Sequence, residues 1–136
     1  MIEPDLLYSV LCDEVRREDN GKLMLLGLFE QIGGVSFPMQ HPGLCIVNKW
    51  CNGEGTWTQQ VRIVDRDDNV LSEDQAVSFE LPSLDVSFTA VGMYRNITFP
   101  APGRAFIEIL LNGELKQRYA LQVVQAQPQG GDVKEG

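Results

Sequence analysis

The chain has a single histidine, three cysteines and no long apolar run in its 136 residues. No stretch approaches the ~20 apolar residues that a membrane-spanning helix requires. The start of the chain carries acids instead of the basic residues of a signal peptide, so nothing there predicts export. An odd, sparse set of cysteines (Cys12, Cys45 and Cys51) fits reduced thiols better than a disulfide framework. These absences together predict a cytoplasmic protein that is not embedded in a membrane.

Basic residues are also scarce. Lysine and arginine number 11 against 19 aspartates and glutamates, which gives a formal net charge of −8. A nucleic-acid binder needs basic side chains that neutralise phosphates, and an anionic membrane surface attracts basic segments in the same way. We therefore expect neither nucleic acid nor a membrane among the partners. Hydrophobic residues make up 43% of the chain, which is ordinary for a globular protein.

Groups for catalysis and metal binding are few. His41 stands in FPMQHPG, where the flanking prolines predict a surface turn, and a general base needs a nucleophile and an orienting group beside it. A pairing of His41 with Cys45 or Cys51 is the arrangement that would make an enzyme of an unfamiliar kind. The cysteines lack the C-x₂-C spacing of structural zinc sites. We expect no enzyme, no metal centre and no cofactor.

One acidic segment partly matches a calcium loop. Asp65, Asp67 and Asn69 stand at alternate positions, as the first ligands of an EF-hand do. The glycine that the loop requires next is Val70, and the glutamate of its twelfth position is Ala76, so an EF-hand is excluded. The default prediction is a β-turn, because Asp and Asn side chains bond their own backbone. A weaker cation site built from these loop carboxylates stays open.

Apolar and polar residues alternate along most of the chain. In TWTQQVRIVD the apolar Trp57, Val61 and Ile63 share one parity, which is the period of a strand with one buried face. No window carries a helical stripe, and turn signals recur at short intervals, as in an antiparallel sandwich. We predict an all-β, antiparallel, immunoglobulin-like sandwich of about eight to ten strands in a single domain, residues 1–125, followed by a flexible tail, residues 126–136. The candidate strands are 5–15, 22–30, 32–37, 44–51, 56–65, 75–81, 85–91, 94–99, 103–111 and 114–125.

The last two candidate strands predict a hairpin around Asn112-Gly113. A two-residue loop would place the apolar residues of the two strands on opposite faces. A three-residue loop that starts at Leu111, with Gly113 in the left-handed position of a bulge, places them on one face. We therefore predict the bulged loop, which sets Glu108 opposite Lys116.

Two tryptophans flank the glycine-rich turn of KWCNGEGTWT. The apolar parity of the two strands around this turn predicts a hairpin that places Trp50 directly across from Trp57. We expect the aromatic pair to cap one end of the core. The alternative is a stacking platform at which Trp50 and Trp57 bind a carbohydrate or another small ligand, since tryptophan is costly to expose and common at binding sites.

The most charged stretch is CDEVRREDNGK, residues 12–22. Glu18 to Gly21 is a reverse-turn signal, so we predict that these charges mark the solvated end of a hairpin rather than a site. The strand that follows, Leu23 to Leu28, opens with four apolar residues and is therefore apolar on both faces. We predict that it is buried on both faces, by the sandwich or by a partner subunit, and that Leu23 and Leu25 lie in an interface.

These segments resemble a family of small, mostly bacterial proteins known as a domain of unknown function. Its members open with a Cys- or Ala-Asp-x-Val strand, an acidic Asn/Gly turn and a Gly-x-(Phe/Tyr) strand, and they close with a Pro-Gly-x-(Tyr/Phe) strand and an (Asn/Asp)-Gly hairpin. The match covers residues 5–125, and Ala105-Phe106 departs slightly from the usual aromatic spacing. The resemblance implies a β-sandwich and carries over no catalytic residues. The matching positions are Cys12, Asp13, Val15, Asn20, Gly21, Gly27, Phe29, Pro102, Gly103, Phe106, Asn112 and Gly113.

The leading hypothesis is a non-enzymatic binding module that recognises another protein or a second copy of itself. Sandwiches commonly place recognition on end loops or on an exposed sheet. A small-ligand-binding domain that uses Trp50 and Trp57 is the runner-up, and an unfamiliar enzyme with His41 is the third hypothesis.

Overall fold

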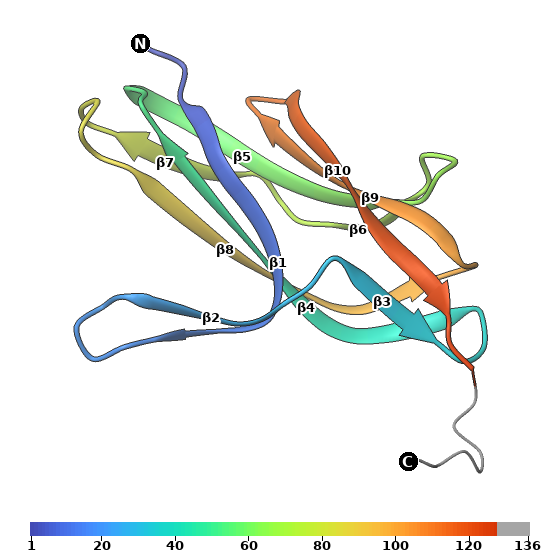
Figure 1. Ribbon diagram of the computed structural model, residues 1–136. Helices are drawn as coiled ribbons and strands as arrows, with labels where there is room; N and C mark the ends of the chain where they lie inside the picture. Colours follow the sequence, from blue (N-terminus) through green and yellow to red (C-terminus); the bar gives the residue numbers. More distant parts are fainter. Residues whose placement is uncertain (128–136) are drawn as a thin grey trace.

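A computed structural model describes residues 1–127 of the chain, and the part of the predicted tail over 128–136 lies outside the described residues. The described residues form an all-β fold of ten strands (Figure 1). No helix is present in this part of the chain, so none could cross a membrane. The strands are β1 (Asp5–Arg17), β2 (Leu23–Leu28), β3 (Gln31–Gly34), β4 (Met39–Cys51), β5 (Gly55–Val64), β6 (Val70–Glu73), β7 (Val77–Leu81), β8 (Phe88–Phe99), β9 (Gly103–Leu111) and β10 (Glu114–Gln125).

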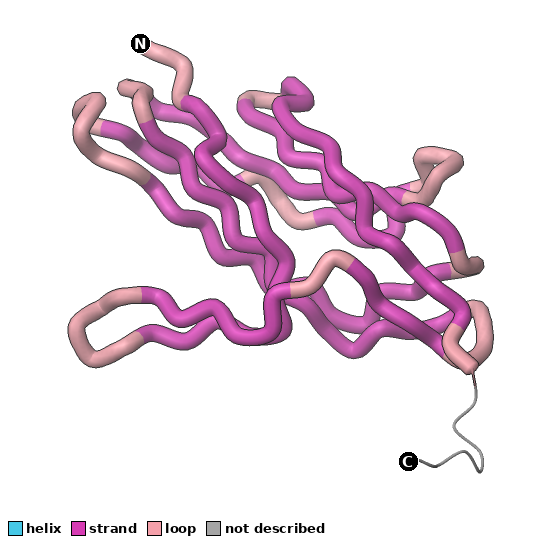
Figure 2. The backbone as a smooth tube through the Cα atoms, in the orientation of Figure 1, coloured by secondary structure: helices cyan, strands magenta, loops and turns pink. Residues whose placement is uncertain are grey.

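The strands form two sheets stacked as a sandwich, and Figure 2 shows them as two layers of extended chain. One sheet has four strands in the order β2-β1-β4-β8. The other has the order β3-β10-β9-β5-β6, and β7 also pairs with β5. Within the described residues β3 runs parallel to β10, which corrects the expectation of a fully antiparallel sandwich. The chain changes sheets between β2 and β3, so no hairpin fixes the direction of β3.

The core lies between the two sheets, and side-chain alternation decides which residues reach it. On β4, Leu44, Ile46 and Trp50 belong to the core, whereas Cys45 and Val47 point to the outer face. Both sheets contribute to one large cluster. Its buried members are Leu11, Ile32, Leu44, Ile46, Trp50, Trp57, Val61, Ile63, Phe79, Leu81, Tyr94, Ile97, Phe99, Ala105, Ile107, Ile109, Leu111, Leu121 and Val123.

Some strand boundaries differ from those expected. The predicted segments 85–91 and 94–99 belong largely to one strand, β8, which pairs with β4 in a single register. Gly92 lies inside that strand, where a Cβ would stand 2.9 Å from the Cε2 atom of Tyr94. This glycine therefore makes room for the Tyr94 ring and does not mark a turn. Residues 70–73, outside the predicted strands, form β6 beside β5.

The β9–β10 loop is shorter than predicted. Leu111 pairs with Glu114, so the loop holds only Asn112 and Gly113. Both have positive φ, 49° and 81°, as a type I′ turn requires. The predicted three-residue loop is therefore wrong.

A bulge inside β10 restores the predicted sharing of faces. The register shifts between Leu115 and Gln117, so the extra residue lies in the strand instead of the loop. Beyond the bulge Arg118 lies opposite Glu108. The predicted pairing of Glu108 with Lys116 is wrong for the same reason.

Side-chain hydrogen bonds also join the two sheets. Buried polar groups stabilise a core only when they are paired, and these bonds tie β1, β4 and β8 to the opposite layer. The bonds join the hydroxyls of Ser9 and Tyr119 at 2.8 Å, Nε1 of Trp50 to Oε1 of Gln59 at 2.8 Å, Nδ2 of Asn48 to the same Oε1 at 3.1 Å, and the hydroxyl of Tyr94 to Oδ2 of Asp74 at 2.7 Å.

Candidate interaction surface

β1 belongs to the sandwich for only part of its length. Residues Asp5 to Cys12 pair with β4, and the pairing with β2 runs from Cys12 to Arg17. Beyond Cys12 the two strands leave the sheet as a two-stranded hairpin, residues 13–27, called the arm below. Figure 1 shows the arm directed away from the sandwich. An isolated hairpin is marginally stable in water, so the arm depends on the surfaces beside it.

The tip of the arm is a hydrogen-bonded turn, as predicted. The N–H of Gly21 donates to the carbonyl of Glu18 at 2.8 Å, and the N–H of Glu18 donates to the carbonyl of Lys22 at 2.8 Å. Oδ1 of Asn20 accepts the N–H of Lys22 at 3.0 Å. Gly21 has a φ of 90°, which glycine adopts without strain. The charged stretch therefore closes a hairpin.

The direction of the arm is set where it leaves the sheet. Gly27 has a φ of 72°, a left-handed conformation that costs any residue with a Cβ. A Cβ at Gly27 would also overlap the carboxylate of Asp13 on the neighbouring strand, with Cγ of Asp13 at 2.9 Å. The thiol of Cys45 donates to the carbonyl of Asp13 at 3.9 Å. Gly27 and Asp13 thus form a tight joint that rests on β4.

A small apolar cluster holds the base of the arm on the outer face of the four-stranded sheet. Cys12, Cys45 and Val47 are buried at its centre, and Val15 and Leu25 of the arm pack against them. Cys12 and Cys45 lie opposite each other on β1 and β4 as free thiols. Burial raises the pKa of both thiols. At neutral pH they therefore act as small apolar side chains, as their strand positions predict.

The rest of β2 is only partly covered. Leu23, Met24, Leu25 and Leu26 are half-buried, and Leu28 is 62% exposed. Leu25 rests on the outer-face cluster, but the chain itself does not bury β2 on both faces. A role for Leu23 and Leu25 in an interface stays a prediction.

A groove separates the arm from the outer face of the four-stranded sheet. It has a volume of about 370 Å³ and is lined by Val15 and Leu23 of the arm and by Cys45, Val91 and Met93 of the sheet. Met93 is 62% exposed. The groove is largely apolar at its floor and charged only where the arm borders it.

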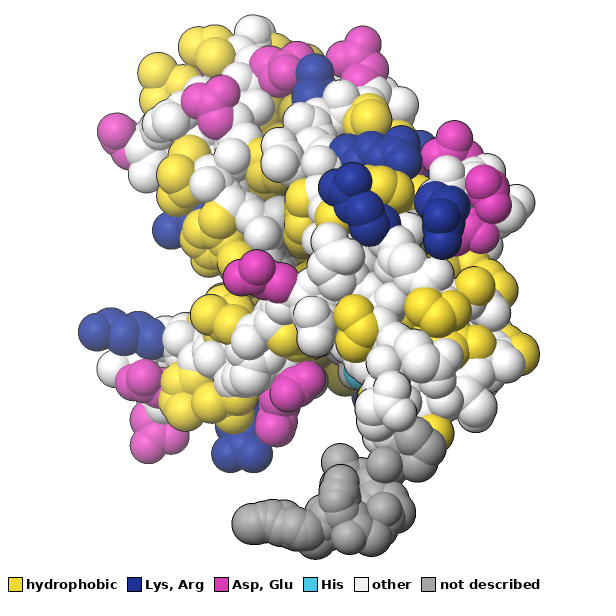
Figure 3. Space-filling model, turned by 45° about the vertical axis from the view of Figure 1, so that its right-hand side comes forward, with side chains coloured by type: hydrophobic (Ala, Val, Ile, Leu, Met, Phe, Trp, Pro, Cys, Tyr) yellow, Lys and Arg dark blue, Asp and Glu magenta, His cyan; other side chains and the backbone are white. Residues whose placement is uncertain are grey.

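A second hollow lies where β2 returns to the sandwich. This cleft has a volume of about 450 Å³, and Leu28 and Glu30 face Ser9 and Tyr119 across it. Figure 3 shows the arm standing clear of the body, with hydrophobic side chains exposed between charged ones. The arm is therefore accessible from two sides.

The two edges of the arm differ in chemistry. β2 is the outermost strand of its sheet and holds neither a charged residue nor a proline. The arm segment of β1 carries Glu14, Arg16 and Arg17, and Nε of Arg16 donates to Glu14 at 2.8 Å. Edge strands of natural proteins are usually protected by charges, prolines or bulges. β2 lacks the charges and prolines, whereas the β1 edge carries charges.

The two tryptophans do not form the predicted hairpin. β4 and β5 lie in different sheets, so Trp50 pairs with Leu6 and Phe88, and Trp57 pairs with Phe79. Trp50 has no exposed surface and Trp57 is 8% exposed. Both belong to the core, and neither offers a face on which a carbohydrate could stack. The hairpin prediction is wrong because the chain crosses between layers at residues 52–54.

His41 lies within β4, not in a surface turn. It is half-buried, pairs with Ile97 and has its ring centroid 6.5 Å from that of Phe29. Around Pro42 the strand β4 pairs only with β8, and proline is tolerated at such an edge. Nε2 of His41 is buried without a hydrogen-bond partner. Among the described residues no hydrogen bond joins His41 to a thiol or a carboxylate.

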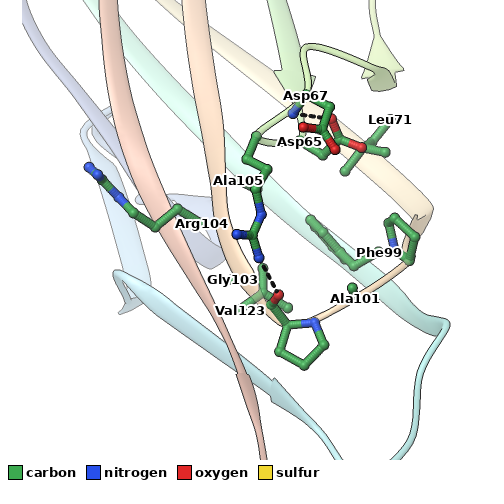
Figure 4. A pocket seen from close by; sticks show the side chains of 12 residues that line it. Asp65, Asp67, Leu71, Phe99, Ala101, Gly103, Arg104, Ala105 and Val123 are labelled. Atoms are coloured by element: carbon green, nitrogen blue, oxygen red, sulfur yellow. Dashed lines mark hydrogen bonds between the residues drawn. The ribbon is translucent and has the colours of Figure 1, made fainter.

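The acidic segment after β5 forms the predicted β-turn. Oδ1 of Asp65 accepts the N–H of Asp67 at 2.9 Å (Figure 4). The same Oδ1 accepts the N–H of Asn69 at 2.9 Å, and Nδ2 of Asn69 donates to Oδ2 of Asp65 at 3.0 Å. These bonds, foremost the one from the Asn69 side chain, lower the pKa of Asp65. Nη2 of Arg66 donates to the carbonyl of Pro102 beside a hollow of about 80 Å³. The described residues hold no group of three potential metal ligands.

One charged cluster was missed by the sequence analysis. On the outer face of the six-stranded sheet, Glu108 accepts hydrogen bonds from Arg62 at 2.9 Å and Arg118 at 3.2 Å, and its side chain is only 7% exposed. The guanidinium of Arg118 lies 4.1 Å from the centre of the Phe106 ring, and Arg104 lies over the same ring at 5.1 Å. The correct β9–β10 register would have placed Arg118 beside Glu108. The Glu108 carboxylate is paired with two guanidinium groups, so the cluster stabilises the sheet.

A family model matches residues 7–124 of the chain, and its description is Family of unknown function (DUF6941). The chain belongs to this family. The match extends from β1 to β10 and confirms the resemblance drawn from the opening and closing segments.

No curated protein matches the chain. A similar solved structure is the Pseudomonas fluorescens alkylpurine DNA glycosylase AlkC bound to DNA containing an abasic site analog, with 11% sequence identity and a TM-score of 0.46. The similarity covers 70% of this chain and 28% of the glycosylase chain. A likeness this weak carries no functional argument.

Proposed function

We propose that this chain is a non-enzymatic, immunoglobulin-like interaction module of the cytoplasm that binds another protein chain through the arm. The observation that carries the proposal is β2, an apolar and uncharged edge strand on a hairpin that stands clear of the sandwich. An edge strand presents unpaired N–H and C=O groups, to which an extended strand of a partner can add. Side chains of the partner would then fill the hollows beside the arm.

The net charge and the burial of the cysteines and tryptophans also support a protein-binding role. A net charge of −8 disfavours nucleic acid and anionic membranes as partners. Cys12 and Cys45 are buried, and burial raises the pKa of their thiols, which disfavours a thiolate nucleophile. Trp50 and Trp57 lie in the core, so the proposal makes no use of them. It includes no cofactor and no metal.

A pair of matched substitutions tests the proposal. Leu28→Asp places a charge on β2 at a position that is 62% exposed, and Val77→Asp does the same on β7 of the other sheet, where Val77 is 48% exposed. Both variants should fold, because neither residue is part of the core cluster. The immobilised full-length chain is mixed with an extract of its source cells, and bound proteins are quantified.

The expected result is loss of the specifically bound proteins with Leu28→Asp and retention with Val77→Asp. Equal retention by both variants would show that β2 does not carry the interaction. Circular dichroism spectra of the two variants establish that a loss of binding is not a loss of fold.

A further inference from the structure

We infer that the partner of β2 is β2 of a second copy of this chain, paired antiparallel about a two-fold axis at Leu26. The inference rests on the proposed function and names its partner. It would join two four-stranded sheets into one continuous sheet across the dimer, with the two arms side by side.

The argument starts from charge complementarity along the strand. Lys22 directly precedes β2, and Glu30 follows it by two residues, where the chain bends toward the other sheet and the carbonyl of Glu30 accepts the N–H of Gln122 at 3.1 Å. In an antiparallel pair centred on Leu26, each residue lies opposite the residue whose number completes a sum of 52. Lys22 of one copy then lies beside the end of β2 that leads to Glu30 of the second copy, and the two-fold axis repeats this pair at the other end. Within the described residues neither side chain has an ion-pair partner of its own.

The same register sets apolar side chains against apolar side chains. Leu26 lies opposite Leu26 of the second copy, and Met24 lies opposite Leu28 of the second copy. Directly opposed residues share a face of the sheet, so Met24, Leu26 and Leu28 of both copies would form one stripe. Leu28, which is 62% exposed in the single chain, would be covered at both ends of the stripe.

Neighbouring registers lack this match. A shift by one residue places Lys22 opposite Phe29, and a shift by two places it opposite Leu28. In these registers Glu30 lies opposite Gly21 or Asn20, so neither charge of a copy meets an opposite charge. In the favoured register Gly27 of one copy lies opposite Leu25 of the second copy. The bend at the base of one arm thus lies next to the residue of the other arm that packs on the outer-face cluster.

A second copy also fits the symmetry of such a contact. A two-fold interface uses the same patch on both subunits and needs that patch to be self-complementary. β2 with its flanks meets this condition through one positive and one negative end. On the β1 edge of the arm the charged side chains already pair within the chain, since Nε of Arg16 donates to Glu14 at 2.8 Å.

Charge exchange tests the pairing with the full-length chain. Lys22→Glu and Glu30→Lys each place like charges opposite each other at both ends of the strand pair, and the double variant restores opposite charges. Sedimentation equilibrium should show a wild-type dimer, a dimer Kd raised roughly tenfold in each single variant, and recovery to within about threefold in the double variant. Both positions are exposed, so the substitutions leave the core unchanged.

Cysteine cross-linking tests the register separately. In a Cys51→Ser background, Leu26→Cys would place two thiols opposite each other at the two-fold axis, within the Cα separation that a disulfide accepts. Mild oxidation should convert this variant to a covalent dimer. Leu25→Cys is the matched control, since its thiol lies opposite Gly27 of the second copy and should cross-link poorly.

The outcomes separate this inference from the proposed function. A wild-type chain that is monomeric at the highest soluble concentration, or single variants that dimerise as the wild type does, would overturn the second copy as the partner. If Leu28→Asp nevertheless abolished binding of other proteins, β2 would still be an interaction site with a different partner. If the wild-type chain were monomeric and Leu28→Asp left the binding of other proteins unchanged, both proposals would fail together.

Discussion

Gly27 lies against Asp13 at the base of the arm, so closely that a Cβ on Gly27 would stand 2.9 Å from Cγ of Asp13. This contact joins β1 and β2 at the point where they leave the sandwich. It explains why a hairpin with no partner strand of its own keeps a defined direction.

The first prediction concerns this joint. Gly27→Ala should destabilise the arm by about 1–2 kcal/mol, because alanine is strained at a φ in the left-handed region and its Cβ displaces Asp13. Hydrogen exchange of the Leu23 to Leu26 amides should accelerate roughly tenfold. Gly43→Ala is the control, since its Cβ would meet nothing closer than the Tyr94 carbonyl at 3.6 Å. Unchanged exchange in Gly27→Ala would contradict the role of the joint.

The second prediction concerns alkaline pH. Burial, followed by the hydrogen bond to Asp74, raises the pKa of Tyr94 above its ordinary value of 10.0. Above pH 10 the unfolded chain loses this proton while the folded chain keeps it, so the unfolded state binds fewer protons and the free energy of unfolding falls. The contribution of Tyr94 to the free energy of unfolding is therefore complete below pH 10 and is lost as the pH rises further.

Tyr94→Phe provides the measurement. Urea unfolding at pH 7 should show a loss of about 0.5–1.5 kcal/mol for the missing hydrogen bond, and the decline of stability between pH 10 and 11 should become shallower. Burial also raises the pKa of Tyr119, so part of the decline should remain. An identical pH profile in wild type and variant would argue against a buried, hydrogen-bonded Tyr94.

The third prediction concerns Glu108. Its carboxylate accepts hydrogen bonds from Arg62 and Arg118 in a nearly closed environment. Glu108→Gln should cost about 1–3 kcal/mol of unfolding free energy, because two guanidinium groups lose their shared counter-charge. Glu114→Gln, at a side chain that is 74% exposed, should change stability by less than about 0.5 kcal/mol. Equal effects of the two substitutions would contradict the cluster.

The fourth prediction concerns the thiols. Cys12 and Cys45 are buried and Cys51 is partly exposed, and burial raises the pKa of the first two. A thiol reagent at pH 8 should therefore label one cysteine quickly in the folded chain and the other two only after unfolding. Cys51→Ser should remove the fast reaction. Rapid labelling of two or more thiols in that variant would show that the outer-face cluster is open.

The alternation of apolar and polar residues and the residue types at the turns predict much of the fold. The shared buried face of Trp57, Val61 and Ile63 is predicted correctly because a strand with one buried face has a period of two residues. The turn at Glu18 to Gly21 is correct because its residues favour a tight turn. Such local rules act within a few residues and do not depend on where the next strand lies.

Sheet membership could not be predicted in the same way. Trp50 and Trp57 are close in sequence and share a parity that fits a hairpin, yet the chain between them crosses from one layer to the other. A short glycine-rich connection can form either a hairpin turn within one sheet or a crossover between the two layers. The charged cluster around Glu108 was missed for a related reason, since no residue type in the sequence marks the one-residue bulge near Leu115 that sets the neighbours of Glu108.

The arm was foreseen in part. The run from Leu23 to Leu28 predicts an apolar strand that needs cover, but the sequence does not show that β1 divides its length between two partners at Cys12. That division depends on long-range pairing with β4. Because of this division, β2 lies at an exposed edge of its sheet and not inside the sandwich.

Hydrogen exchange measured as a function of protein concentration tests the central claim most directly. If β2 pairs with a second copy, amides of Leu23 to Leu28 should become more protected as the concentration rises from roughly 1 to 100 µM, while those of β7 do not change. In Lys22→Glu the same gain should require a roughly tenfold higher concentration, and the double variant Lys22→Glu, Glu30→Lys should restore the wild-type concentration dependence. Protection of β2 that is independent of concentration would contradict pairing between copies.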